Sequence, residues 1–341
     1  MDHGGSLERA RALFPHAPEP FVDLSTGINP HSYPFFALPA TALSRLPEPA
    51  RARELGEVAA QAYGAPSAAH VVAAPGTQIL LPLVASLAKP GLARVLSPTY
   101  AEHAQAARVA GHEVEQVENF EALAQADLAV VVNPNNPDGR VVSREKLLGL
   151  AARLHAKGGL LVVDEAFMDV GPGVESLAGD VGHSGMAVLR SFGKFFGLAG
   201  VRLGFALADE ATARRLDARL GPWAVSGPAL EYGIRALADT RWQQQMRERL
   251  AKEAARLDAL LARHGAPVRG GTSLFRYLEF PGAAGLFSAL GEQGILLRHF
   301  VGRPHALRAG LPGTEEEWRR LEAALASRAG KRDHPREEPR S

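Results

Sequence analysis

Lys194 stands in a stretch of sequence that suits covalent catalysis. It ends the run Arg190-Ser191-Phe192-Gly193-Lys194, which follows an apolar segment. A lysine bounded by glycine and aromatic residues after a buried strand differs from a solvated surface lysine, and its amine can form a Schiff base with a carbonyl group. Ser191 and Lys194 also spell Ser-x-x-Lys, the acyl-enzyme motif of penicillin-binding proteins, but that class carries Ser-Asp-Asn and Lys-Thr-Gly as well. The sequence contains neither, so we expect a Schiff-base lysine.

Asp164 ends a second apolar run, in Val162-Val163-Asp164-Glu165-Ala166-Phe167. Beside a pyridinium nitrogen this acid would keep the nitrogen protonated, and a protonated ring is the better electron sink. The alternatives are an exposed acid at a strand end and the Walker B acid of an ATPase. The second alternative requires a Gly-x-x-x-x-Gly-Lys-[Ser/Thr] loop, which the sequence lacks.

Three further segments follow predicted strands. Ala74-Pro75-Gly76-Thr77-Gln78 predicts a turn and a helix start, whose N–H groups could bind a phosphate, although an ordinary turn is the better interpretation of this segment alone. Ser97-Pro98-Thr99-Tyr100 places an aromatic ring where it could stack on a flat ligand or lie in the core. In the segment 133–139, Asn-Pro-Asn-Asn-Pro-Asp-Gly, local turn chemistry and a hydrogen bond to a phenolic oxygen are equally good explanations.

The elements that must position these residues alternate between short apolar runs and helical patterns, which indicates a three-layer α/β domain with a mostly parallel sheet. We expect strands at 71–74, 94–96, 128–132, 160–163, 187–189 and 203–206, and helices at 78–87, 101–110 and 144–155, the last capped by Ser143. Ligands of such sheets bind at the carboxyl ends of the strands.

The later part of the chain predicts a smaller α+β domain. It carries a long helix at 242–264, strands at 273–280 and 295–297, and a capping box at Thr314 and Glu317 that opens a last helix ending near Leu325. We expect residues 1–45 to form an N-terminal arm and part of the small domain, 46–208 the large domain with a helical continuation to about 235, 236–328 the small domain, and 329–341 a disordered tail.

Composition excludes several classes of protein. The 341 residues are 46% hydrophobic and suit two domains, and a net charge of +1 provides no overall attraction to nucleic acid or to a membrane surface. The absence of cysteine excludes disulfides, thiolate metal sites and a cysteine nucleophile. The first residues do not resemble a secretory signal, and the apolar runs are far shorter than the roughly 20 residues that span a bilayer. We expect a cytoplasmic enzyme without a metal.

In order and spacing, these segments resemble the aminotransferases that depend on pyridoxal phosphate (PLP) and share the aspartate aminotransferase fold. The resemblance covers almost the whole chain, and it implies a homodimer in which Lys194 holds PLP covalently. It also implies six cofactor contacts: Ser191, Arg202 and the Gly76-Thr77-Gln78 amides with the phosphate, Asp164 with the pyridine nitrogen, Asn136 with the phenolic oxygen, and Tyr100 against the ring.

Within this family the chain looks most like the histidinol-phosphate aminotransferase branch and, inside it, like a group of decarboxylases. His3-Gly4-Gly5, the segment 23–30 and the segment 191–204 carry this second likeness. The resemblance implies that Arg308 binds the α-carboxylate of the substrate, which suits guanidinium geometry. The other substrate contacts that it implies are Arg298 with a substrate phosphate, assisted by His3 and Asn29, and Gly27 and Asn136 nearby.

Two positions depart from the family pattern. Phe167 stands where many aminotransferases have a tyrosine that contacts the phenolic oxygen, and Leu46 stands where a tyrosine reaches the PLP of the neighbouring subunit. An aminotransferase acting on a phosphorylated substrate would use the same cofactor residues, so this alternative stays open beside the decarboxylase. A regulator that senses PLP would carry a DNA-binding domain, for which we expect no room before His3.

Overall fold

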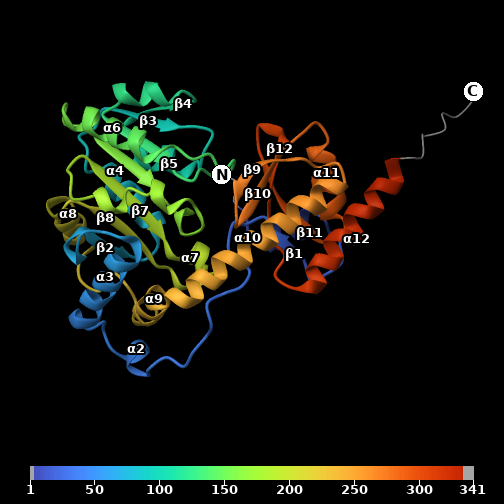
Figure 1. The fold of residues 1–341 in the computed structure, drawn as a ribbon, viewed down its shortest axis with the longest axis horizontal. Helices are drawn as coiled ribbons and strands as arrows, with labels where there is room; N and C mark the ends of the chain where they lie inside the picture. Colours follow the sequence, from blue (N-terminus) through green and yellow to red (C-terminus); the bar gives the residue numbers. More distant parts are fainter. Residues whose placement is uncertain (1–3, 333–341) are drawn as a thin grey trace, which may run out of the picture. The chain divides into compact units, whose positions relative to one another are not determined.

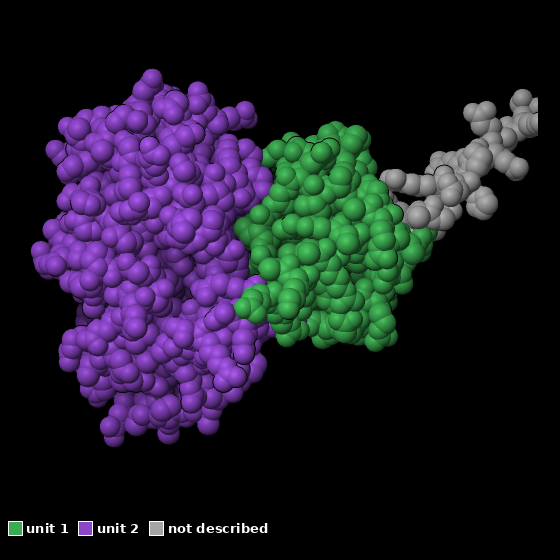
Figure 2. All heavy atoms as spheres, viewed as in Figure 1, with its two compact units in different colours: residues 1–30, 248–341 green, residues 31–247 purple. Residues whose placement is uncertain are grey.

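The structure is a computed structural model that describes residues 4–332. The chain forms two compact units, a smaller one of residues 1–30 and 248–341 and a larger one of residues 31–247 (Figure 2). These boundaries differ from the expected ones at 45 and 235, and the second boundary falls inside helix α10 (Thr240–Arg263). Because a continuous helical pattern runs through this point, the sequence contains no signal for it.

A seven-stranded sheet forms the centre of the larger unit (Figure 1). In spatial order its strands are β2 (Val71–Ala74), β8 (Gly204–Ala208), β7 (Met186–Ser191), β6 (Leu160–Asp164), β5 (Leu128–Val132), β3 (Leu92–Leu96) and β4 (Glu113–Val117). Strand β8 runs antiparallel to both of its neighbours, and every other neighbouring pair is parallel. The expected α/β fold with a mostly parallel sheet is therefore confirmed.

The central strands carry apolar side chains on both faces of the sheet, and they are therefore buried. Every residue of β5, β6, β7 and β8 is buried, whereas the edge strand β4 is polar and largely exposed. One face packs on α4 (Thr77–Ala85), α5 (Glu102–Val109) and α8 (Glu210–Leu220). Helix α6 (Arg144–His155) packs against β6, and Ser143 caps it as expected by accepting a hydrogen bond from the amide of Lys146.

Two further helices of the larger unit pack against each other. They are α3 (Pro49–Tyr63) and α9 (Gly227–Ala238), and α3 also packs against β2. Proline stands in the first turn of each helix, where its missing N–H has no helical partner to lose.

The smaller unit contains a five-stranded sheet (Figure 1). In spatial order its strands are β1 (Val22–Leu24), β11 (Ile295–Phe300), β12 (Arg303–Gly310), β10 (Phe275–Glu279) and β9 (Val268–Thr272). Strand β1 pairs with β11 in parallel, and the other pairs are antiparallel. Strands β1, β9 and β12 have no counterpart among the expected elements.

Helices α1 (Leu7–Leu13), α11 (Ala283–Gly291) and α12 (Glu315–Arg332) complete the smaller unit. The capping box is confirmed, because the amide of Glu317 donates to Oγ1 of Thr314 and the amide of Thr314 donates to Oε2 of Glu317. Helix α12 ends at Arg332, so the expected end near Leu325 was wrong. No helix within residues 4–332 combines the length and the apolar character that crossing a bilayer requires.

Candidate active site

The turn between β2 and α4 forms a small cradle in the larger unit. Gly76 has a φ of 88°, which favours glycine. A Cβ on Gly76 would lie 2.6 Å from Nη2 of Arg202, and a Cβ on Gly204 would lie 2.5 Å from the amide nitrogen of Thr77. The turn, the guanidinium and the start of β8 are therefore closely packed. Because the first N–H groups of α4 have no helical partner, this cradle suits a phosphate.

Ser191 lies at the same edge of the sheet. In the strand register, Gly204 is opposite both Ser191 on β7 and Ala74 on β2. Arg202 adopts the left-handed conformation with a φ of 54°, which is uncommon for a residue with a side chain and is often found at functional sites. The structure thus brings together Ser191, Arg202 and the Gly76 turn, the groups that the resemblance assigns to one phosphate.

Lys194 lies on the single helical turn α7 (Phe192–Phe195), directly after β7. The phenylalanines at both ends of this turn are fully buried, and the ring of Phe192 stacks on that of Phe196 with centroids 4.5 Å apart. Lys194 is only half-buried. Buried aromatic rings therefore fix the helical turn that carries Lys194, which follows Ser191 by three residues.

Asp164 ends β6 and is buried, with 5% of its surface exposed, so the alternative of an exposed acid at a strand end is wrong. Its Oδ2 lies 2.8 Å from Nε2 of His103, which donates to the carboxylate, and its Oδ1 accepts from the amide of Ala166 at 3.0 Å. Both oxygens are thereby oriented. Sequence reasoning missed His103, although a histidine on the buried face of the alanine-rich α5 was a signal for a polar contact.

Tyr100 extends this group of side chains. Its ring meets that of His103 edge to face at 6.0 Å, and its hydroxyl donates to Oε1 of Gln78 at 3.1 Å. Burial, together with the carboxylates of Glu102 and Asp164, raises the pKa of Tyr100 to about 12. The tyrosine is therefore neutral near pH 7. The predicted residues Gln78, Tyr100 and Asp164 thus belong to one cluster.

The three asparagines of the turn 133–139 have different surroundings. Asn133 exchanges two hydrogen bonds with the backbone of Val142, and Asn135 donates to Asp138 and to the carbonyl of Pro98. Local turn chemistry therefore accounts for these two residues. Asn136, which the resemblance assigns to the phenolic oxygen, is half-buried in the same turn, and its role stays a prediction.

A buried ion network lies next to these residues in the chain. Nη1 of Arg190 donates to Glu165 at 3.0 Å and Nη2 donates to Asp169 at 2.8 Å, with all three side chains buried. The Arg190 guanidinium also lies 4.4 Å from the ring centroid of Tyr63. Burial opposes the charge of Arg190, but Asp169 and Glu165 outweigh this effect and raise its pKa. The network ties the residue after Asp164 to the residue before Ser191.

The residues of the larger unit fit PLP. The cradle that a Cβ on Gly76 would fill suits its phosphate, the buried and oriented carboxylate of Asp164 suits a pyridinium nitrogen, and Lys194 can carry the covalent link. Within residues 4–332 there is no group of three or more histidines and acids that could hold a metal ion.

Arg308 lies on β12 in the smaller unit, with 8% of its surface exposed. Its Nη2 donates to the carbonyl of Ser25 at 2.7 Å, and its guanidinium lies 5.2 Å from the ring centroid of Phe275. Burial and the nearby Arg298 lower the pKa of Arg308 to about 10, while Asp23 acts in the opposite direction. The environment therefore disfavours the charge of Arg308.

Arg298 stands directly opposite Arg308 in the register of β11 and β12. Residues opposite each other share a face of the sheet, and like charges in such positions destabilise the pair. Burial, and then Arg9, lowers the pKa of Arg298 as well. An anionic ligand on this face would relieve the repulsion.

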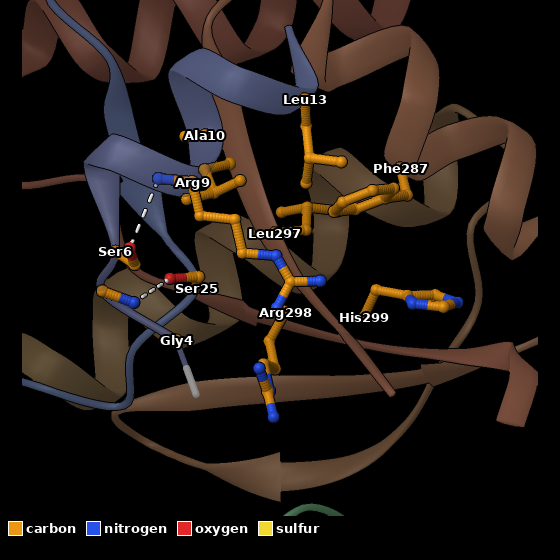
Figure 3. Close-up of a pocket in the computed structure, with 12 residues that line it drawn as sticks. Gly4, Ser6, Arg9, Ala10, Leu13, Ser25, Phe287, Leu297, Arg298 and His299 are labelled. Carbon is orange, nitrogen blue, oxygen red and sulfur yellow. Dashed lines mark hydrogen bonds between the residues drawn. The ribbon is translucent and has the colours of Figure 1, made fainter. Parts of the chain in front are cut away.

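A pocket of about 200 Å³ lies beside Arg298 in the smaller unit (Figure 3). Its described lining comes from the start of the chain and α1, from Ser25, from Phe287 on α11 and from residues 296–299 of β11.

The segment 23–29 holds the remaining predicted substrate residues. A Cβ on Gly310 would lie 2.5 Å from the carbonyl oxygen of Thr26, so this segment packs directly on β12. Gly27 and Asn29 are buried, and their predicted contacts with substrate stay predictions. His3 lies outside the described residues.

The two departures from the family pattern have different surroundings. Phe167 is buried at 4% exposure, three residues after Asp164, and contributes a ring without a hydroxyl. Leu46 is 64% exposed in the single chain.

Comparison with known proteins places these features in a family. The family model for aminotransferase class I and II matches residues 38–325. The chain is 45% identical over 328 residues to the threonine-phosphate decarboxylase of Pseudomonas aeruginosa, an alignment that covers 95% of this chain and 97% of the relative. It is 41% identical over 327 residues to the threonine-phosphate decarboxylase of a Sinorhizobium species, with the same coverage.

Solved structures share the fold. The histidinol-phosphate aminotransferase of Sinorhizobium meliloti in complex with pyridoxal-5'-phosphate superposes with a TM-score of 0.78 at 20% identity, covering 95% of this chain and 94% of that one. The L-threonine-O-3-phosphate decarboxylase of Porphyromonas gingivalis gives a TM-score of 0.73 at 22% identity, covering 91% and 99%. At these identities the likeness establishes the fold alone.

Proposed function

Because this chain belongs to the class I and II aminotransferase family, with PLP as its cofactor, we propose that it decarboxylates L-threonine O-3-phosphate. The products are (R)-1-amino-2-propanol O-2-phosphate and CO₂, and the reaction belongs to cobalamin biosynthesis. The relatives at 45% and 41% identity support this choice by their names. The observation that carries it is the pair of opposed arginines, Arg298 and Arg308, since the substrate has two anionic groups.

Residues of the larger unit hold and tune the cofactor in this proposal. Lys194 would carry the covalent link, while Ser191, Arg202 and the Gly76 turn would hold the phosphate. Asp164, which His103 orients, would keep the ring nitrogen protonated. PLP, when bound, supplies the electron sink for the pair released from Cα.

Arg308 selects the bond that breaks. Only a bond held perpendicular to the cofactor ring can release its electrons into the ring, and a guanidinium that grips the α-carboxylate fixes that orientation. Arg308 would hold the bond from Cα to the carboxylate in the orientation that favours loss of CO₂. Lys194, or a water, would supply the proton that Cα takes up, and Asn136 would contact the phenolic oxygen and the substrate.

Arg298 would bind the phosphate of the substrate, assisted by His3 and Asn29, and Gly27 would be a further substrate contact. Arg298 is half-buried, so it provides its charge where water screens it less than at the surface.

Lys194→Ala tests the covalent link. We expect the variant to lose the visible absorption of the bound cofactor and nearly all turnover, because no other amine replaces the one removed. An absorption spectrum and a CO₂ assay measure both effects, and undiminished turnover would contradict the proposal.

The alternative function is that of an aminotransferase acting on a phosphorylated substrate such as histidinol phosphate, because the cofactor residues are the same. The PLP-loaded protein is incubated with threonine phosphate without any 2-oxo acid. Release of CO₂ and formation of an aminopropanol phosphate support the decarboxylase. Turnover that depends on a 2-oxo acid acceptor supports the aminotransferase.

We further propose that the protein is a cytoplasmic homodimer. The family resemblance supports the homodimer, and the absence of cysteine fits a reducing compartment such as the cytoplasm. Because Leu46 stands in place of the tyrosine that reaches the neighbouring subunit in relatives, the dimer would form without that contact. Light scattering of the purified protein measures its mass.

A further inference from the structure

The pocket of Figure 3 brings two arginines together from distant parts of the sequence. Arg9 extends from α1 toward Arg298 on β11, and both line the pocket. None of the lining residues that the structure describes is acidic. The presence of Arg9 contributes to the lowered pKa of Arg298, after burial. The two arginines give the described part of the lining positive charge, which suits an anion.

The position of Arg9 is fixed by packing at both ends of its segment. At the beginning, the amide of Gly5 donates to Oγ of Ser25 at 2.8 Å, and a Cβ on Gly4 would lie 2.4 Å from the carbonyl oxygen of Ser25. Beyond the other end of α1, Phe14 packs on the ring of Phe287 at 5.6 Å. Arg9 is thus held beside the sheet by its helix.

One side of the pocket is charged and the other is apolar. Ala10, Leu13, Phe287 and Leu297 provide apolar surface, while the arginines and His299 provide nitrogen atoms. A phosphomonoester on a short carbon chain matches this division. Its phosphate carries a charge of about −1.5 to −2 near pH 7 and offers three acceptor oxygens, enough for two guanidinium groups.

We propose that Arg9 is a second phosphate ligand beside Arg298, and that this pair selects phosphorylated substrates over unphosphorylated amino acids. The inference rests on the proposed function, which assigns a substrate phosphate to Arg298 but gives Arg9 no role. A neutral hydroxyl would bring no negative charge to the two guanidinium groups that line the pocket. Unphosphorylated threonine therefore gains little from the pocket.

Arg11 provides a matched control on the same helix. Its Nε donates to Oε1 of Glu19 at 2.7 Å, and it does not line the pocket. A charge removed there changes the net charge of the protein by the same amount as a charge removed at Arg9.

The test compares the PLP-loaded wild type with Arg9→Gln, Arg9→Lys, Arg298→Gln and Arg11→Gln. We expect Arg9→Gln to raise the KM for threonine phosphate by about 10- to 100-fold, the value of one charge-assisted hydrogen bond. The expected kcat stays within about twofold, because a contact with the phosphate is equally strong in the ground state and in the transition state. The kcat/KM for L-threonine stays unchanged, because L-threonine has no phosphate for Arg9 to bind. Arg9→Lys should recover part of the loss, and Arg11→Gln should match the wild type.

Calorimetry of inorganic phosphate binding distinguishes a site for the phosphate of the substrate from a separate phosphate site. Weaker phosphate binding together with a raised KM in Arg9→Gln supports the inference. Weaker phosphate binding with an unchanged KM would overturn it, because the pocket would then be a separate phosphate site. An unchanged phosphate affinity in Arg9→Gln would also overturn it. Failure of the wild type to release CO₂ would instead count against the proposed function, and the phosphate titration would still decide whether Arg9 binds the anion.

Discussion

Two arginines of this protein are almost equally buried and differ in what surrounds their charge. Arg190, in the larger unit, is 5% exposed and has two carboxylates beside it, which raise its pKa. Arg308, in the smaller unit, is 8% exposed and stands opposite Arg298. Burial, and then Arg298, lowers its pKa to about 10 against the opposite effect of Asp23. The charge of Arg190 is balanced within the fold. The environment of Arg308 favours a ligand that brings negative charge.

This difference assigns the two arginines different tasks. A buried arginine with its own carboxylates stabilises the fold, and removing it leaves those carboxylates as uncompensated charges. A buried arginine next to another cation reduces stability and is explained by what it binds. Burial alone therefore does not separate a structural arginine from a binding one, whereas the sign of the neighbouring charge does.

Removal of Arg190 is expected to have the largest effect on stability. Arg190→Met should lower the free energy of unfolding by about 3–5 kcal/mol, because Glu165 and Asp169 would stay buried without their cation. Denaturant unfolding of the PLP-free protein measures this change, and Arg11→Gln, which removes an exposed pair, serves as the control. Equal stability of the Arg190→Met variant and the wild type would show that Arg190 does not stabilise the fold.

Arg308→Met should separate stability from activity. Because the substitution removes the cost of burying this charge and also the repulsion by Arg298, we expect the free energy of unfolding of the ligand-free protein to stay level or to rise, by up to about 3 kcal/mol from the lowered pKa. Its kcat/KM for threonine phosphate should fall at least about a hundredfold, since the carboxylate loses a charge-assisted contact. A variant that is strongly destabilised would show that Arg308 acts mainly in the fold.

His103→Gln tests orientation at the cofactor side. An amide can still donate to Asp164 but lacks the rigid ring, so we expect bound PLP, a folded protein and a kcat that is lower by roughly tenfold, as for other residues that orient a functional group. The absorption spectrum and steady-state kinetics measure both. A kcat equal to that of the wild type would show that the amide of Ala166 orients Asp164 sufficiently.

The smallest expected effect is on the pH dependence of stability. Below about pH 10, Arg308 is charged in the folded and the unfolded protein, and the fold bears the full unfavourable contribution. Above about pH 10 the folded state loses this proton before the unfolded state does. The unfolded state then binds more protons, so the contribution of Arg308 to stability rises with pH. The difference in stability between Arg308→Met and the wild type should therefore be smaller at pH 11 than at pH 8. A difference that grows with pH would contradict the lowered pKa.

Much of the larger unit could be predicted from the sequence. The all-apolar runs that form β5 and β6 predict buried strands. Asp164, Ser191 and the Gly76 turn directly follow runs of this kind. Because strand ends meet at one edge of a sheet, order along the chain was enough to bring these residues together.

The contacts that the sequence did not predict join residues far apart in the chain. His103 meets Asp164 and Arg190 meets Glu165 through packing, and no local pattern encodes either contact. Strand β12 was missed although Arg308 was singled out, because a buried arginine interrupts the apolar pattern by which strands are recognised. Arg9 was missed because a helix of seven residues with exposed charges looks like any solvated surface.

The pairing of β1 with β11 has a consequence for how the protein is made. Val22 pairs with Ile295, so β1 leaves the ribosome long before the strand that it pairs with. At a synthesis rate of about 5–20 residues per second, roughly 15 to 55 seconds pass before that neighbour exists. During this interval Val22 and Leu24, both buried in the finished protein, have no sheet to join. The nascent chain thus carries an apolar segment that chaperones can bind until β11 has been made.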